Sequence, residues 1–175
     1  MSLPKLIELN GVDFVTIDAI GSPGERTFFL QAAQEDTLVT LIIEKEHAAA
    51  LSIAIQGILE QLGGPAGEHE SANPDLVHPV KPLFRVGRLG LGYDEARDML
   101  IIMAESLATE ESPQVTRVRL FANRVQMAAL ARKAAIAVTS GRPVCMLCDE
   151  PINPGEEHVC VKGNGRKRIY ELDGD

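Results

Sequence analysis

The feature that most constrains the fold of this 175-residue chain is the placement of two helical periodicities among seven strand-like runs. Four runs rich in β-branched, aromatic and aliphatic residues come first, at residues 6–9, 12–20, 27–32 and 37–43. Three more follow the first helical pattern, at residues 83–92, 99–107 and 115–121. This order lacks the strict strand–helix alternation that builds a parallel doubly wound sheet. We therefore expect an α+β fold: a largely antiparallel sheet of six to seven strands, with two helices on one face.

The first helix is expected to start at Glu44 and to end before Gly63. Glu44 and Glu46 lie in the first turn, where the helix dipole favours negative charge. Apolar residues then recur at spacings of three and four, at Ala48, Leu51, Ile55, Ile58 and Leu62.

The second helix is expected to begin after Asn123 and to end at Gly141. Asn123 is a favourable N-cap, and Gln126 stands three residues later, where the partner in a capping box belongs.

Residues 63–82 contain four of the ten prolines and predict a long, mobile loop. Its histidines, His69 and His78, could supply a second metal site or a lid residue, although solvated loop histidines are the ordinary case. The chain is thus expected to comprise an α+β domain at residues 1–140 and a separate C-terminal segment at residues 141–175.

The C-terminal segment contains all three cysteines, at positions 145, 148 and 160, together with His158. A Cys-x-x-Cys turn lets two thiolates converge on one ion, and a second arm must supply two more donors to complete a tetrahedron. His158 and Cys160 are two residues apart, so they share one face of an extended strand. The pattern predicts a zinc ribbon or knuckle in which Zn²⁺ is held by Cys145, Cys148, His158 and Cys160.

Four protein ligands leave no open position on the ion, which favours a structural site over a catalytic one. A thioredoxin-like redox pair should open a helix after a strand, whereas this Cys-x-x-Cys precedes a loop rich in proline and glycine. A nucleobase deaminase needs a His-x-Glu sequence, and none of the four histidines is followed by one. A disulfide framework is disfavoured by the odd number of cysteines and by the absence of a signal peptide.

The formal net charge of −8 is unevenly distributed along the chain. Residues 1–80 contain three basic and twelve acidic side chains, whereas residues 81–142 contain ten basic and six acidic ones. The total disfavours a general nucleic-acid binder, although a local basic surface stays open. No apolar run approaches the length needed to span a bilayer, so a cytoplasmic protein with no membrane association is expected.

A possible anion or partner surface is expected on the predicted sheet. Strand alternation places Arg117 and Arg119 on the same face, away from the core. Arg85 and Arg88 would join them if their strand lies nearby. Such a surface could bind phosphate, nucleic acid or an acidic partner. The alternative is that these arginines belong to the solvated face of a one-sided sheet and bind no ligand.

Several stretches of the chain carry a resemblance to a known protein family. They are the segment from Gly21 to Gln31, the residues 41–45 before the first helix, Phe84 to Gly87, and residues 141–148 with His158, Cys160, Asn164 and Gly165. Together they resemble an uncharacterised bacterial domain-of-unknown-function family over nearly the whole chain. The resemblance implies a shared fold and a shared cysteine/histidine cluster, with no activity to transfer. Met146 and Asp149 depart from the family pattern, which has proline and glycine there.

Two functional hypotheses follow from the sequence. The first is a non-enzymatic, zinc-containing binding or regulatory module with a protein or nucleic-acid partner. The alternative is a metal-independent hydrolase or phosphoryl-directed enzyme that uses the arginine-bearing face, the helix start at Glu44 and His47, and the loop as a lid. Convergence of Arg85, Arg117 and Arg119 with an acid or a histidine in one concave pocket would favour the enzyme.

Overall fold

The computed structural model describes residues 5–22, 24–65, 74–140, 147–148, 158–159 and 167–168. The chain divides into two compact units, residues 1–21 with 26–138 and residues 22–25 with 139–175. The first unit contains a sheet and two helices, α1 (Lys45–Gln61) and α2 (Arg124–Thr139). Its strands are β1 (Leu6–Leu9), β2 (Phe14–Ile20), β3 (Thr27–Gln34), β4 (Thr37–Ile43), β5 (Phe84–Asp94), β6 (Met99–Ser106) and β7 (Arg117–Ala122).

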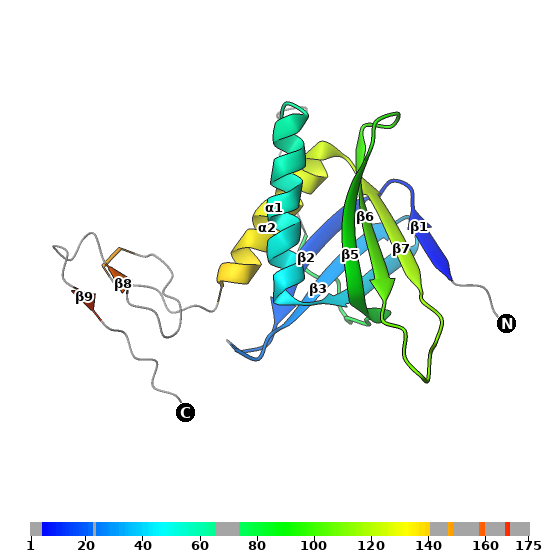
Figure 1. The fold of residues 1–175 in the computed structure, drawn as a ribbon, viewed down its shortest axis with the longest axis horizontal. Coiled ribbons are helices and arrows are strands. Elements are labelled where there is room, and N and C mark those ends of the chain that lie inside the picture. The colour runs from blue at the N-terminus through cyan, green and yellow to red at the C-terminus, as the bar shows by residue number, and fades with distance from the viewer. Residues whose placement is uncertain are drawn as a thin grey trace. The chain divides into compact units, whose positions relative to one another are not determined.

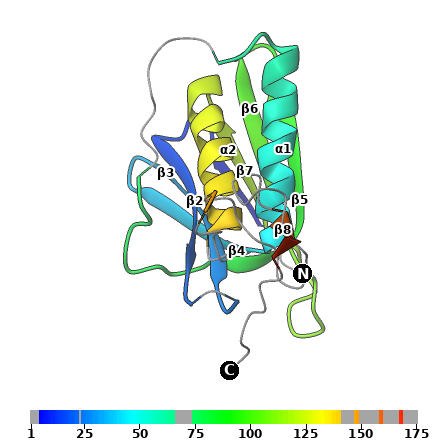
Figure 2. The same cartoon turned by 90° about the vertical axis from the view of Figure 1, so that its left-hand side faces the viewer.

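These strands form one mixed sheet of seven strands in the order β1-β7-β6-β5-β4-β3-β2. Four neighbouring pairs are antiparallel, as expected, but β1 runs parallel to β7 and β4 runs parallel to β5. The second parallel pair arises because α1 carries the chain back along the sheet, so that β5 starts at the same end as β4. Figures 1 and 2 show both helices on the same face, which confirms the α+β class of the prediction.

The order of the strands requires the sheet to curl. β1 and β2 are consecutive in sequence and lie at opposite edges, joined by only residues 10–13. In a flat sheet those edges would be about 29 Å apart, whereas a link of this length spans at most about 18 Å. The curl is visible in Figure 1, where β2 and β3 run at a steep angle to β5 and β6.

The core lies between the curled sheet and the helices. Fully buried side chains come from β2, β3, β4, β6 and β7 and from both helices, among them Ile17, Leu30, Leu41, Leu100, Ile102, Leu120, Ile55, Met127 and Leu130. Ser52 of α1 donates a hydrogen bond to the carbonyl oxygen of Ala131 in α2, at 2.8 Å. This buried contact joins the two helices directly, so they cover the sheet as one layer.

Helix α2 begins with the capping box that the sequence predicts. The backbone N–H of Gln126 donates to Oδ1 of Asn123 at 2.8 Å, and the backbone N–H of Asn123 donates to Oε1 of Gln126 at 3.0 Å. Two N–H groups that the helix leaves unpaired are thereby satisfied. Helix α1 stops where expected, since Gly63 and Gly64 adopt positive φ angles of 88° and 92°.

Residues 74–82 lie within the region predicted as a mobile loop, and the structure shows how this part contacts the sheet. Gln31 of β3 is fully buried on the sheet face opposite the helices. Its side-chain amide accepts the backbone N–H of Val77 at 2.7 Å and donates to the carbonyl oxygen of Val77 at 3.2 Å and to Oγ1 of Thr40 at 3.1 Å. The segment therefore covers β3, with Leu76 buried beside it.

We predict that Gln31→Leu destabilises the protein by about 1–3 kcal/mol, because it removes the buried amide that pairs with the N–H and carbonyl groups of Val77 and with the buried hydroxyl of Thr40. Urea unfolding measures the difference. Gln34→Leu, at the partly exposed end of the same strand, is the matched control and should change the free energy of unfolding little. Equal losses in the two variants would contradict the role assigned to the Gln31 amide.

Candidate functional site

The predicted zinc ligands lie partly outside the described residues. Cys145 and Cys160 are not described, whereas Leu147 and Cys148 form a turn and His158 begins a short strand, β8 (His158–Val159). β8 pairs antiparallel with β9 (Lys167–Arg168), with His158 opposite Arg168. The backbone is therefore extended at His158, as the two-residue spacing of the second arm requires.

Within the described ranges, no group of three or more His, Cys, Asp or Glu side chains is arranged to hold a metal ion. Since two of the four expected ligands lie outside those ranges, this finding does not test the C-terminal cluster. The zinc site stays a prediction.

The sheet face bearing the predicted arginine surface is lined with ion pairs. Arg117 of β7 pairs with Glu105 of β6 at 3.0 Å, and Arg119 pairs with Glu8 of β1 at 3.6 Å. Each pair joins residues that are direct neighbours across two strands. The guanidinium groups are about half exposed, so these pairs contribute little stability. They nonetheless balance the positive charge locally.

Arg88 of β5 lies opposite Glu105 of β6, which in turn lies opposite Arg117 of β7, so the three residues form one row across the strands. Arg88 is exposed and has no ion-pair partner within the described part of the chain. The row therefore alternates arginine, glutamate and arginine, which is the pattern of a solvated sheet face.

Arg85 lies apart from that row, at the start of β5. Its guanidinium pairs with Oε1 of Glu44 at 2.7 Å, and Glu44 precedes α1. The backbone N–H of Glu44 donates to Nδ1 of His47 at 3.1 Å. The imidazole nitrogen is thus used in capping the helix, and the Glu44/His47 helix start has a structural explanation.

The cavity that contains Arg85 does not bring the predicted arginines together. A cavity of about 380 Å³ in the first unit is lined by Arg85 together with Lys5 and several hydroxyl groups, but not by Arg117 or Arg119. Neither histidine of the predicted loop is among its lining residues: His78 is exposed, and His69 lies outside the described residues. This cavity therefore lacks the arrangement expected of the hydrolytic alternative.

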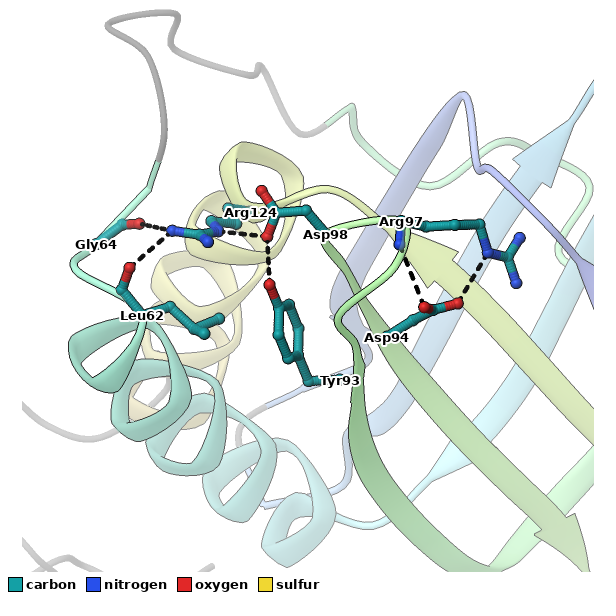
Figure 3. A network of polar contacts seen from close by, with 7 residues as sticks. All are labelled: Leu62, Gly64, Tyr93, Asp94, Arg97, Asp98 and Arg124. Atoms are coloured by element: carbon teal, nitrogen blue, oxygen red, sulfur yellow. Dashed lines mark hydrogen bonds and ion pairs between the residues drawn. The ribbon is translucent and has the colours of Figure 1, made fainter.

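A polar network that the sequence analysis did not single out joins both helices to the turn between β5 and β6 (Figure 3). Arg124, at the start of α2, donates to the carbonyl oxygens of Leu62 at 2.8 Å and Gly64 at 3.2 Å. It also pairs with Asp98 at 2.7 Å, and Asp98 accepts the hydroxyl hydrogen of Tyr93 at 2.7 Å. Arg124 thus satisfies carbonyl groups at the end of α1, where a helix leaves acceptors unpaired.

These contacts shift the pKa values of the network. The hydrogen bond to Asp98 raises the pKa of the Tyr93 phenol, and burial raises it further. The hydrogen bonds from Tyr93 and from Arg124 lower the pKa of Asp98. The neighbouring carboxyl of Asp94 has a lowered pKa because Arg97 donates to it. Arg97 also lies over the ring of Phe121, 4.1 Å from its centroid. Each of these pKa shifts thus has a partner within the fold, as expected of a structural ion-pair network.

Among the described helices, none is both long and apolar enough to cross a membrane.

With the fold and these sites in view, the comparisons with known proteins identify the family. A family model described as a protein of unknown function, DUF3090, matches residues 7–160. The chain belongs to the DUF3090 family. This match confirms the resemblance to a domain-of-unknown-function family that the sequence carries, and it extends over both cysteine arms of the C-terminal segment. No curated protein and no solved structure matches the chain.

We predict that Asp98→Asn lowers the pKa of Tyr93, because it removes the carboxylate that holds the phenol protonated while leaving Arg124 nearby. The variant suits the backbone, since Asp98 has a φ of 51° and asparagine tolerates that region. NMR titration of the Tyr93 ring carbon measures the shift. Asp94→Asn is the control and should leave the Tyr93 pKa unchanged; an unchanged or raised value in Asp98→Asn would contradict the network.

The same network predicts the sign of a dependence on pH. Because the pKa of Asp98 is lowered on folding, its contribution to stability is present above the pKa of the unfolded chain and is lost as the pH falls through the folded value. Unfolding curves recorded between neutral and acidic pH should therefore converge for the wild type and Asp98→Asn as Asp98 becomes protonated.

Proposed function

We propose that the protein is a zinc-containing binding module, in which Cys145, Cys148, His158 and Cys160 hold a structural Zn²⁺ ion and the α+β unit supplies a separately folded body. The observation that carries the proposal is the antiparallel pairing of β8 with β9. An extended strand at His158 is the conformation in which side chains two residues apart point to the same side. The turn at Leu147 and Cys148 agrees with the first arm of a ribbon.

The donor set fits zinc better than it fits other common metals. Three thiolates and one imidazole match the soft and borderline ligands that zinc prefers, and they complete a tetrahedron without a water molecule. Such a site contributes to folding directly, because its ligands converge only in the folded chain. A small segment with little apolar sequence gains its stability in this way.

A role in binding agrees with the character of the first unit. Its conspicuous arginines, Arg117 and Arg119, lie on an open sheet face and are paired with acids on neighbouring strands. A surface of alternating charges suits recognition of a protein partner with a complementary pattern. We favour a protein over a nucleic acid as the partner, because phosphate groups would have to displace Glu8 and Glu105 from these arginines.

We predict one zinc ion per purified chain by elemental analysis. Removal of the metal with a strong chelator should abolish the amide hydrogen-exchange protection of β8 and β9, because their short pairing depends on the metal. Strands β3 and β4 should keep their protection, since buried side chains of the first unit pack them against its two helices.

Matched variants separate this site from adventitious metal binding. His158→Asn and Cys148→Ser should each lower the zinc content, whereas His78→Asn, which removes an exposed histidine of the first unit, should retain one zinc per chain. A protein that contains no zinc, or that keeps it in His158→Asn, would show that the structural-site proposal is wrong.

A further inference from the structure

The cavity beside Arg85 has the composition of a binding site. Its lining comes from the start of β5, the end of β6, the loop that leads to β7, and the residue before β1. That loop extends beyond the end of the sheet (Figure 1). The lining residues are Lys5, Leu83, Phe84, Arg85, Ser106, Leu107, Thr109, Ser112 and Thr116. They include two cationic side chains and four hydroxyl groups, and no carboxylate.

The two cations differ in how they are held. Arg85 is fixed by Glu44, which contacts one nitrogen of the guanidinium group at 2.7 Å. A guanidinium has five N–H donors, so several are left for a ligand. Lys5 is exposed at its side chain, but its backbone is fixed, because its carbonyl oxygen accepts the N–H of Arg117 at 2.8 Å. The guanidinium group of Arg85 and the backbone of Lys5 are therefore both held in place.

Two of the four lining hydroxyl groups accept backbone N–H groups, which leaves their own hydrogens for a ligand. Oγ of Ser106 accepts the backbone N–H of Thr116 at 2.9 Å, and Oγ1 of Thr109 accepts the backbone N–H of Ser112 at 2.9 Å. A hydroxyl that acts as an acceptor retains its own hydrogen for another partner. The cavity thus presents hydrogen-bond donors together with positive charge, which are the groups that recognise an oxyanion.

An apolar wall completes the cavity, and its position depends on a glycine. β5 contains a bulge between Val86 and Arg88, at Gly87. A Cβ atom at Gly87 would lie 2.5 Å from Cδ2 and 2.8 Å from Cγ of Leu107. The Leu107 side chain thus occupies the space that any other residue at position 87 would fill, and it lines the cavity beside Leu83 and Phe84.

We propose that this cavity binds a small phosphomonoester whose organic group is short and apolar. A phosphate presents three acceptor oxygens and nearly two negative charges, which matches Lys5, the N–H groups of Arg85 that Glu44 leaves unused and several hydroxyl donors better than a carboxylate does. A volume of about 380 Å³ is at the lower end for small-molecule sites, so the ligand is of metabolite size. The proposal goes beyond the zinc module and does not depend on the metal, because every lining residue belongs to the first unit.

The test is a two-dimensional ¹⁵N–¹H NMR titration of the full-length protein with n-butyl phosphate, inorganic phosphate and butyrate. Saturable shifts should centre on the amides of residues 83–85 and 106–116. n-Butyl phosphate should bind more tightly than inorganic phosphate, because its alkyl group contacts the apolar wall, and butyrate should bind most weakly. No saturable shift with n-butyl phosphate, or butyrate binding as tightly, would overturn the proposal.

Matched variants locate the site. Lys5→Met should weaken n-butyl phosphate binding about tenfold, because a charge-assisted contact is lost, whereas Arg132→Met, on the exposed side of α2, removes one charge outside the cavity and should leave the affinity unchanged. Thr116→Val removes one hydroxyl donor at constant shape and should weaken binding severalfold; Thr37→Val, at an exposed strand position, is its control. Equal affinities within each pair would assign the shifts to diffuse surface attraction and refute the cavity.

Gly87→Ala tests the apolar wall separately. The added methyl group displaces Leu107, so the preference for n-butyl phosphate over inorganic phosphate should fall. An unchanged preference would show that Leu107 does not contact the alkyl group and would remove the apolar part of the proposal. Dispersed amide signals in each variant establish that the fold is retained.

Discussion

The short link between β1 and β2 is the constraint on which the rest of the structure depends. These strands lie at opposite edges of a seven-stranded sheet but are joined by only four residues. The link is fastened at both sides: Val12 donates its N–H to the carbonyl oxygen of Phe121 in β7, and Asp13 donates to that of Ala33 in β3. The sheet must therefore curl, and the two helices pack against its concave face.

The curl gives the two halves of the opposite face different environments. The β2–β4 half is covered by residues 74–82, and the buried amide of Gln31 satisfies the backbone of Val77 there. The hydroxyl of Thr16 is also buried on this half and has no hydrogen-bond partner among the described residues. The other half, formed by β5–β7 and β1, is open and bears charged side chains. A face that is buried on one half and solvated on the other explains why apolar and polar residues do not alternate uniformly along β3.

The strands and both helices can be located from the sequence because their signals are local. Asn123 and Gln126 make a capping box whose two hydrogen bonds involve neighbours in sequence, and Gly63 stops a helix through its own backbone. The two parallel pairs depend on contacts between distant segments, which periodicity does not record. The role of Gly87 is of the same kind, because it is set by the side chain of Leu107 across a strand pair.

The candidate sites show the same division between local and distant information. Alternation correctly places Arg117 and Arg119 on one face, since each follows from a period of two. Their acidic partners, Glu105 and Glu8, are revealed only by the strand register. From the sequence alone, His47 is a candidate catalytic residue. In the structure its ring nitrogen accepts the backbone N–H of Glu44, which gives it a role in capping the helix. The spacing of the cysteines is also a local signal: it predicts a metal site in the C-terminal segment and carries no information about the first unit.

The uneven charge along the chain is partly balanced in space by ion pairs. The acidic N-terminal region supplies partners for three basic residues of the middle region: Glu8 pairs with Arg119, Glu44 with Arg85, and Asp18 with Lys133. A basic segment in sequence is therefore not a basic surface in the fold. What distinguishes the cavity beside Arg85 is that its lining contains no carboxylate, while Glu44 contacts the arginine from outside the lining. Because Glu44 balances the charge of Arg85, the net positive charge of the lining comes from Lys5, and an anion gains from it together with the hydroxyl donors and the N–H groups of Arg85 that Glu44 does not contact.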